Sequence, residues 1–282
     1  MALLLYAAVI LCSASQSALS KLGGKRGTDP FRFNFYKASF AFLLFFCAFL
    51  ITEHALHTPT IIYGAIYGAL LSVSMHCGYV ALSIGPMSLT SMLATFSLII
   101  PCLYGAICLE EQITVFSWFG FLFLLAALIF LNIKEKKDDK KPSVAWAINI
   151  TLTIMANGFA SVLLTMHQND FPGSYRFTFM SAAMILCTIA FAILGLLKKE
   201  LILRPSVAEI MGGAAGVLNG LSNFFTLWLA ALSFATVLFP LISASTMLAA
   251  LLVGKFFFKE KLTKFQIIGF IFGVASVLLL NF

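Results

Sequence analysis

Polar side chains recur every three or four residues in four otherwise apolar segments of this sequence. That spacing places them along one face of an α-helix. The set comprises Ser13, Gln16, Ser17, Ser72, His76, Tyr79, Asn157, Ser161, Asn219, Ser222, Asn223 and Thr226. Hydroxyl, amide and imidazole groups make hydrogen bonds without needing a fixed charge. The chemistry that they favour is the binding of a neutral or zwitterionic solute, such as an amino acid.

Each of these residues also has a purely structural interpretation. Serine and threonine in membrane helices commonly bond to their own backbone or join two helices. The pair Asn219 and Asn223 favours function more strongly, because amides are costly to bury. His76 is the only histidine well inside a predicted span. It either serves the solute, by binding it or by titrating near neutral pH, or is a neutral ring bonded to a neighbouring helix.

The residues that most enzymes and proton-coupled cation exchangers need are poorly represented. All eleven carboxylates lie in loops or in the end turns of apolar segments, whereas such exchangers usually need one deep in the membrane. Only His76 or Glu209 could serve as the titratable group of such an exchanger. The six cysteines form no C-x-x-C pair, and no G-x-S-x-G accompanies His76. We therefore expect no enzyme, no metal and no other cofactor. An intramembrane enzyme and a non-transporting membrane scaffold are the alternatives.

Composition assigns these polar faces to membrane helices. Hydrophobic residues make up 61% of the 282 and charged residues only 10%, against roughly 25% charged in soluble domains. A bilayer core is spanned by about 20 apolar residues. Runs of that size lie near 2–20, 31–52, 60–84, 86–108, 113–133, 143–166, 175–197, 207–233, 235–257 and 264–282. The predicted fold is an all-α integral membrane protein with ten transmembrane helices.

Short motifs recur in the same order in the two halves of the chain. The pairs begin at Phe31 and Tyr175, Ala81 and Ala231, Glu111 and Glu260, and Leu131 and Leu280, which lie 144 to 150 residues apart. Five helices are an odd number, so the second half must enter the bilayer upside down. We therefore predict two inverted five-helix repeats, residues 1–138 and 139–282. Many secondary transporters are built in this way, with the solute site near the midplane.

Lysine and arginine mark one set of loops. Fifteen of the 18 lie in or beside the loops after the first, fifth, seventh and ninth spans. The positive-inside rule places these loops in the cytoplasm and both termini outside. The net charge of +7 is thus spread over loops, which favours lipid headgroups as partners and argues against nucleic acid. Lys37, inside the second span, is expected to extend to the headgroups.

Glycine and proline add constraints on helix geometry. Glycines four residues apart occur at Gly64 and Gly68, at Gly212, Gly216 and Gly220, and at Gly269 and Gly273. Such steps let helices approach closely, either within one chain or between the two copies of a homodimer. Pro101 and Pro240 are expected to break their helices, and unwound backbone at such points can line a cavity.

The segments from Pro101 to Thr114 and from Gly254 to Gly273 each hold an acidic hinge before a glycine-bearing helix. They resemble segments of the drug/metabolite transporter superfamily, and the whole chain is most similar to its EamA-like ten-helix branch. The resemblance implies that the fifth and tenth helices lie outside a cavity formed by the other eight. It also implies that Glu111 and Glu260 are structural caps, and that the termini are cytoplasmic, in contrast to the charge pattern.

These features together predict a secondary transporter in a cell membrane of the bacterial inner or plasma membrane type. It would move a small organic metabolite by alternating access of two inverted halves. Export is the commoner direction in the family that the chain resembles.

Overall fold

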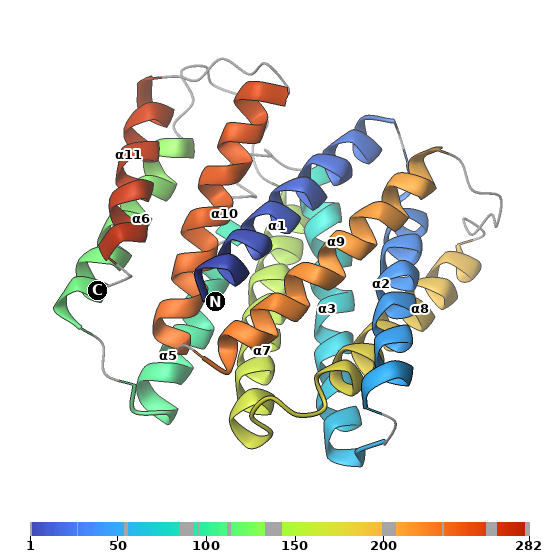
Figure 1. Cartoon of the computed structure of the whole chain (residues 1–282). Coiled ribbons are helices and arrows are strands. Elements are labelled where there is room, and N and C mark those ends of the chain that lie inside the picture. The colour runs from blue at the N-terminus through green and yellow to red at the C-terminus, as the bar shows by residue number, and fades with distance from the viewer. Residues whose placement is uncertain are drawn as a thin grey trace. The chain divides into compact units, whose positions relative to one another are not determined.

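The computed structural model is built from helices. It describes residues 2–26, 28–53, 56–84, 93–94, 96–111, 114–132, 143–198, 207–232, 234–257 and 264–279. The helices are α1 (Ala2–Lys25), α2 (Pro30–Thr52), α3 (Thr58–Ile84), η1 (Phe96–Leu98), α5 (Ile99–Cys108), α6 (Val115–Asn132), α7 (Val144–Asp170), α8 (Arg176–Leu197), α9 (Val207–Ala230), α10 (Ala235–Phe257) and α11 (Lys264–Leu279) (Figure 1). All regular elements in these ranges are helical, as the sequence predicts.

Each apolar run predicted from the sequence contains helix, although the run 86–108 is described only from residue 93 onward. Four helices in the described part of the chain, α2, α3, α7 and α8, are long and apolar enough to cross a membrane. Several others hold shorter apolar stretches. The chain is therefore a multi-pass membrane protein, while the count of ten spans and the inverted repeat stay predictions.

The helices pack into two compact units. Unit 1 consists of Met1–His76 and Leu163–Leu232, and unit 2 consists of Cys77–Val162 and Ser233–Phe282. Each unit combines segments from both halves of the sequence. The boundary predicted between residues 138 and 139 separates the two duplicated halves of the sequence, and it does not describe how the helices pack. It stays a prediction.

In unit 1, α2 packs against both α8 and α9, and α1 lies along α9 (Figure 1). Gly212, Gly216 and Gly220 form the face of α9 that meets α2. A Cβ atom at Gly216 would overlap the backbone oxygen of Lys37, and one at Gly212 would press on that of Phe33. The glycines therefore bring the two backbones together, as the predicted small-residue step requires.

A second close contact joins α3 to α8 in the same unit. A Cβ atom at Gly64 would overlap the backbone oxygen of Phe179, and one at Gly68 that of Ala183. The thiol of Cys187 donates to the backbone oxygen of Gly68 at 3.1 Å. These glycines pack within the chain, which is one of the two roles that the sequence allowed.

Two helix starts in unit 1 are capped in different ways. Asp29 precedes Pro30 of α2 and accepts from the backbone N–H of Phe31 at 2.8 Å, the ordinary local cap. The start of α8 has no local side-chain cap. Instead, Glu53 at the end of α2 accepts from the backbone N–H groups of Phe177 and Thr178, both at 2.8 Å. This carboxylate replaces water at a helix start, where orphan N–H groups are costly to bury.

In unit 2, the fifth and tenth predicted spans, now α6 and α11, pack along each other. Ser276 donates to the backbone oxygen of Gly120 at 2.8 Å, and the ring of Phe272 stacks on Phe130. Glu111 accepts from the backbone N–H of Thr236 at 2.9 Å, in the first turn of α10. The predicted capping role of Glu111 is thus confirmed, whereas Glu260 lies outside the described residues.

The two prolines have different outcomes, because the 3-10 turn η1 gives way to α5 just before Pro101, whereas α10 runs on through Pro240. Pro101 lies in the first turn of α5, where a missing N–H is tolerated. Pro240 lies inside α10, which continues from Ala235 to Phe257, so the expected break is wrong. Proline leaves the oxygen of residue i−4 without its helical donor. Here that oxygen belongs to Thr236, and the Cys102 thiol lies 4.0 Å from it as a weak replacement.

The glycine contact between α2 and α9 can be tested by adding one small side chain. Gly216→Val should lower the free energy of unfolding by about 1–3 kcal/mol, because the new atoms overlap the backbone of α2. The melting temperature in detergent measures this. Ala214→Val, at an exposed position of the same helix, should melt with the parent. Equal melting of both variants would contradict the packing.

Candidate solute-binding site

Unit 1 brings together predicted polar residues from α1 and α9. The hydroxyl oxygens of Ser13 and Ser222 lie 2.7 Å apart. On α9, the amide of Asn223 donates to the side-chain oxygen of Asn219 at 3.2 Å. Tyr67, on α3, donates its hydroxyl to Asn223 at 3.3 Å. Three helices thus contribute hydroxyl and amide groups as two hydrogen-bonded sets that share α9, together called the amide cluster below.

Other predicted residues of unit 1 bond to their own helix. Ser72 donates to the backbone oxygen of Gly68 at 2.8 Å, and Thr226 donates to that of Ser222 at 2.9 Å. These bonds agree with the structural interpretation of single hydroxyls. The side-chain oxygen of Gln16, in contrast, is buried without a hydrogen-bond partner. The side chain of Ser17 lies outside the described part of the chain.

His76 is held by ring contacts. Its ring stacks on Phe31 with the centroids 4.7 Å apart, and its Nδ1 atom is buried without a partner. A buried polar atom left unpaired costs about 1–3 kcal/mol. The His76 nitrogen can therefore accept or donate a hydrogen bond with an incoming polar molecule, and the Gln16 oxygen can accept one.

The remaining predicted residues belong to unit 2. Asn157 on α7 donates to the hydroxyl of Ser97 at 2.9 Å, and Ser161 donates to the backbone oxygen of Asn157 at 3.1 Å. Tyr79 is half-buried near the end of α3. The twelve residues therefore form two groups, and their roles in binding solute stay predictions.

Among the polar residues of unit 1, the sequence pattern did not single out Tyr67 and assigned Lys37 a different position. Tyr67 lies in an apolar run and its ring is largely apolar, so its own position does not mark it as a polar contact. The only indication in the sequence is Asn223, the residue to which its hydroxyl donates. Lys37 is buried, with 9% of its surface exposed. The expected extension of Lys37 to headgroups is wrong, because α2 is covered by both α8 and α9.

A hydrogen-bonded chain joins the end of α7 to the starts of α3 and α8. The predicted span ended at residue 166, but α7 continues to Asp170, and His167 in its last turn is fully buried. Arg176 donates Nε–H to the oxygen of Gln168 at 3.4 Å, and Gln168 donates to His167 Nδ1 at 2.9 Å. Thr60 lies between His167 Nε2 at 3.3 Å and His57 Nδ1 at 2.9 Å.

The direction of this chain follows from its first member. Arginine has only donors, which fixes the amide oxygen of Gln168 toward Arg176 and its amide nitrogen toward His167. His167 must then accept at Nδ1 and donate from Nε2 to Thr60. The ring is therefore a neutral tautomer, and the chain holds Gln168 and Arg176 in fixed orientations.

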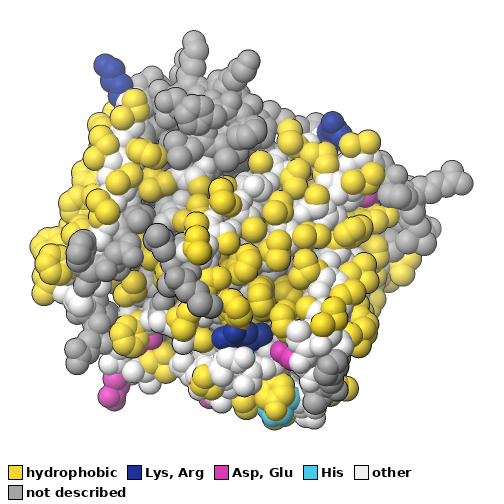
Figure 2. All heavy atoms as spheres, viewed as in Figure 1, with side chains coloured by type: hydrophobic (Ala, Val, Ile, Leu, Met, Phe, Trp, Pro, Cys, Tyr) yellow, Lys and Arg dark blue, Asp and Glu magenta, His cyan; other side chains and the backbone are white. Residues whose placement is uncertain are grey.

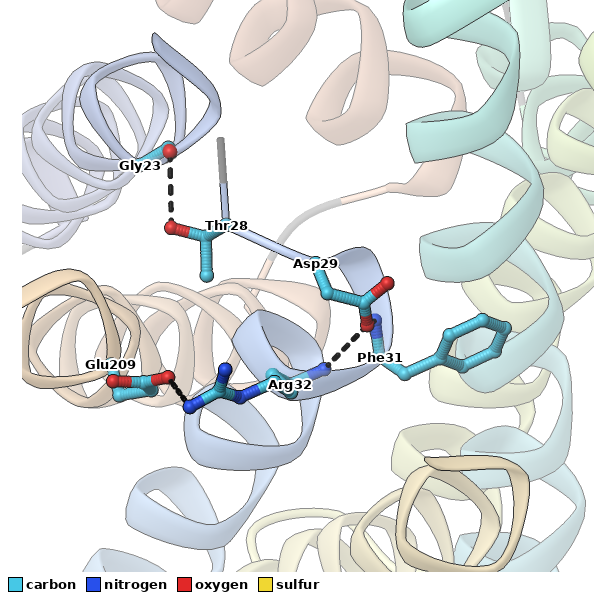
Figure 3. A network of polar contacts seen from close by, with 6 residues as sticks. All are labelled: Gly23, Thr28, Asp29, Phe31, Arg32 and Glu209. Atoms are coloured by element: carbon cyan, nitrogen blue, oxygen red, sulfur yellow. Dashed lines mark hydrogen bonds and ion pairs between the residues drawn. The ribbon is translucent and has the colours of Figure 1, made fainter. Parts of the chain in front are cut away.

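The buried carboxylate of Glu209 is paired. It forms an ion pair with Arg32, and only 1% of it is exposed. Figure 3 shows this pair beside the cap in which Asp29 accepts from the backbone of Arg32, and near the bond from Thr28 to the backbone oxygen of Gly23. Removing either ion would leave the other buried charge uncompensated. The pair therefore fixes the start of α9 against the start of α2.

Among the described residues, no group of three His, Cys, Asp or Glu side chains could hold a metal ion.

Residues 1–133 match the model of the EamA-like transporter family, which confirms the resemblance seen in the sequence. A solved structure titled "Crystal structure of protein" shares 16% identity and superposes with a TM-score of 0.81. The superposition covers 99% of this chain and 98% of the chain in the solved structure, so the two have the same fold. No curated protein matches the chain.

The contact between Tyr67 and Asn223 can be measured with a double-mutant cycle. Tyr67→Phe and Asn223→Ala remove its two partners singly and together. We expect a coupling of about 0.6 kcal/mol in the free energy of unfolding, the mean for hydrogen bonds between membrane helices. Strictly additive effects of the two substitutions would show that the hydroxyl and the amide do not interact.

Proposed function

We propose, from the match of residues 1–133 to the EamA-like transporter family, that this chain is a secondary transporter of a small organic solute. That the chain is a membrane transporter follows from the family match and from the apolar helices. The solute class and the binding residues are the proposal. The observation that carries them is the cluster of hydroxyl and amide groups contributed by α1, α3 and α9.

The cluster fits a neutral or zwitterionic solute because its members carry no net charge. Ser13 and Ser222 offer hydroxyls, and Asn219 and Asn223 offer both donors and acceptors. The bonds around Asn223 are 3.2 and 3.3 Å long, near the upper end of ordinary hydrogen bonds. Exchanging them for bonds to a solute therefore costs little. The unpaired atoms of Gln16 and His76 would add two further contacts.

We infer that transport proceeds by alternating access between two inverted five-helix halves. This mechanism requires helix contacts that slide or rock while the solute site stays at the midplane. The expected direction is export of a metabolite such as an amino acid. Coupling to a proton through a deep carboxylate is disfavoured, because the buried Glu209 is already paired with Arg32.

An intramembrane enzyme is the second candidate from a different class. It would need a nucleophile activated by a neighbouring base. His76 is the best base in the sequence pattern, but its ring stacks on Phe31 and its Nδ1 atom contacts no serine in the described residues. That geometry favours transport over catalysis.

Uptake into proteoliposomes tests the proposal. The purified parent is reconstituted and offered a panel of radiolabelled neutral, zwitterionic, anionic and cationic metabolites. Asn223→Leu should lower uptake of the preferred solute about tenfold, because one to two hydrogen bonds to the solute are lost. Asn149→Leu is the matched control, since Asn149 is partly exposed and bonds to its own backbone.

Two results would contradict the proposal. Uptake by Asn223→Leu at the parental rate would exclude the amide cluster as the solute site. Conversion of a panel member to a product, with no accumulation of the intact solute, would favour the enzyme.

A further inference from the structure

Unit 1 contains a hollow that the amide cluster does not include. Its volume is about 500 Å³, and it lies between the end of α2, the start of α8 and the second half of α9. The residues that matter for its chemistry are Glu53, Tyr175, Arg176, Phe177, Phe224 and Trp228. Low in the view, Figure 2 shows Lys or Arg atoms just below a stretch of hydrophobic side chains, with an acidic group close by.

Arg176 is the cation of this hollow, and it is held in place on two sides. Its guanidinium lies over the ring of Trp228, 5.0 Å from the centroid. Its Nε–H donates to Gln168 at 3.4 Å. Gln168 is in turn fixed by His167. The terminal Nη groups make no hydrogen bond to any described residue, so the planar face and one edge of the guanidinium are fixed while its other donors stay available.

Glu53 does not neutralise Arg176 by a direct pair. It is close enough for its charge to act on the guanidinium. However, its two oxygens accept from the backbone of Phe177 and from both the backbone and the hydroxyl of Thr178, at 2.6 to 2.8 Å. The carboxylate is thus committed to the start of α8, where it balances the partial positive charge of the helix end. The donors of Arg176 keep their capacity to bind an anion.

The apolar side of the hollow is aromatic. The ring of Phe177 stacks on that of Phe224, with centroids 5.0 Å apart, and Phe224 lies 5.6 Å from Trp228. His57 stacks on Tyr175 at 4.3 Å and thereby fixes the loop before α8. A flat or apolar group entering the hollow would meet aromatic rings within reach of the guanidinium.

We propose that this hollow, the Arg176 pocket, binds the oxyanion group of an organic anion that has an apolar body. A carboxylate or phosphate accepts two N–H bonds from the fork of Arg176. The body of the anion lies on Phe177, Phe224 and Trp228. The anion arrives either from the aqueous phase, as a soluble carboxylate, or from the bilayer, as a lipid headgroup. The proposal concerns binding and is independent of which solute the chain transports.

Trp228 supplies the signal for a binding experiment. The full chain is purified with Trp118→Phe and Trp146→Phe, so that Trp228 is the only tryptophan. Phenylacetate is titrated while the fluorescence of Trp228 is recorded, with phenylacetamide and phenethylamine as neutral and cationic analogues of the same shape. We expect saturable quenching by phenylacetate and at least tenfold weaker binding of both analogues.

Arg176→Gln should weaken phenylacetate binding at least tenfold, because the charged fork is lost. Arg176→Lys should give an intermediate Kd, since a point charge remains without the fork. Arg26→Gln is the matched control, because Arg26 is an exposed arginine of the same unit. The melting temperature of each variant reports its folding.

The source of the anion is separated by lipid composition. The parent is placed in nanodiscs of phosphatidylcholine alone or with phosphatidylglycerol. If the headgroup occupies the pocket, phosphatidylglycerol should raise the apparent Kd for phenylacetate, and Arg176→Gln should remove that effect. If the anion is soluble, the two lipid compositions should give the same Kd.

The proposal fails if phenylacetamide binds to the parent as tightly as phenylacetate. That comparison needs no pocket variant and decides the question even if Arg176→Gln loses its fold. It also fails if folded Arg176→Gln binds phenylacetate like the parent. Neither outcome affects the proposed transport function, which is tested separately by solute uptake and by the Asn223→Leu variant.

Discussion

Two helix pairs in unit 1 approach so closely that no side chain fits between their backbones, and the candidate sites depend on these contacts. α9 meets α2 at Gly216, and α3 meets α8 at Gly68. Lipid offers no hydrophobic driving force between helices, so such dense packing is a principal source of their association. Tyr67 is adjacent to Gly68, and Asn223 lies two turns after Gly216. The distance between their polar atoms is therefore set by glycine contacts that carry no chemistry themselves.

Helix ends impose the second constraint, because an unpaired N–H group is costly away from water. Each unit meets it with a carboxylate from a distant segment. Glu53 caps the start of α8 in unit 1, and Glu111 caps the start of α10 in unit 2. A carboxylate used in this way has its oxygens occupied, so it contributes charge without being available as a ligand. This explains why Arg176 keeps free donors although an acidic residue lies near it.

The two candidate sites of unit 1 use opposite chemistry on different sides of α9. The amide cluster around Asn223 has donors and acceptors but no net charge, which suits a solute that crosses the membrane by exchanging hydrogen bonds. The Arg176 pocket combines a fixed cation with aromatic rings, which suits an anion with an apolar body.

The sequence by itself determined the positions of the helices and the close contacts at glycine, because apolar runs and small-residue steps are local patterns, whereas the capping role of Glu111 came from the family resemblance. It also indicated the family. The tertiary structure alone decided that Lys37 is buried, that His167 bonds to Thr60 of α3, and that α10 continues through Pro240. Each of these depends on a partner more than a hundred residues away or on helices packed over a face. Local sequence patterns carry no information about which distant group fills that space.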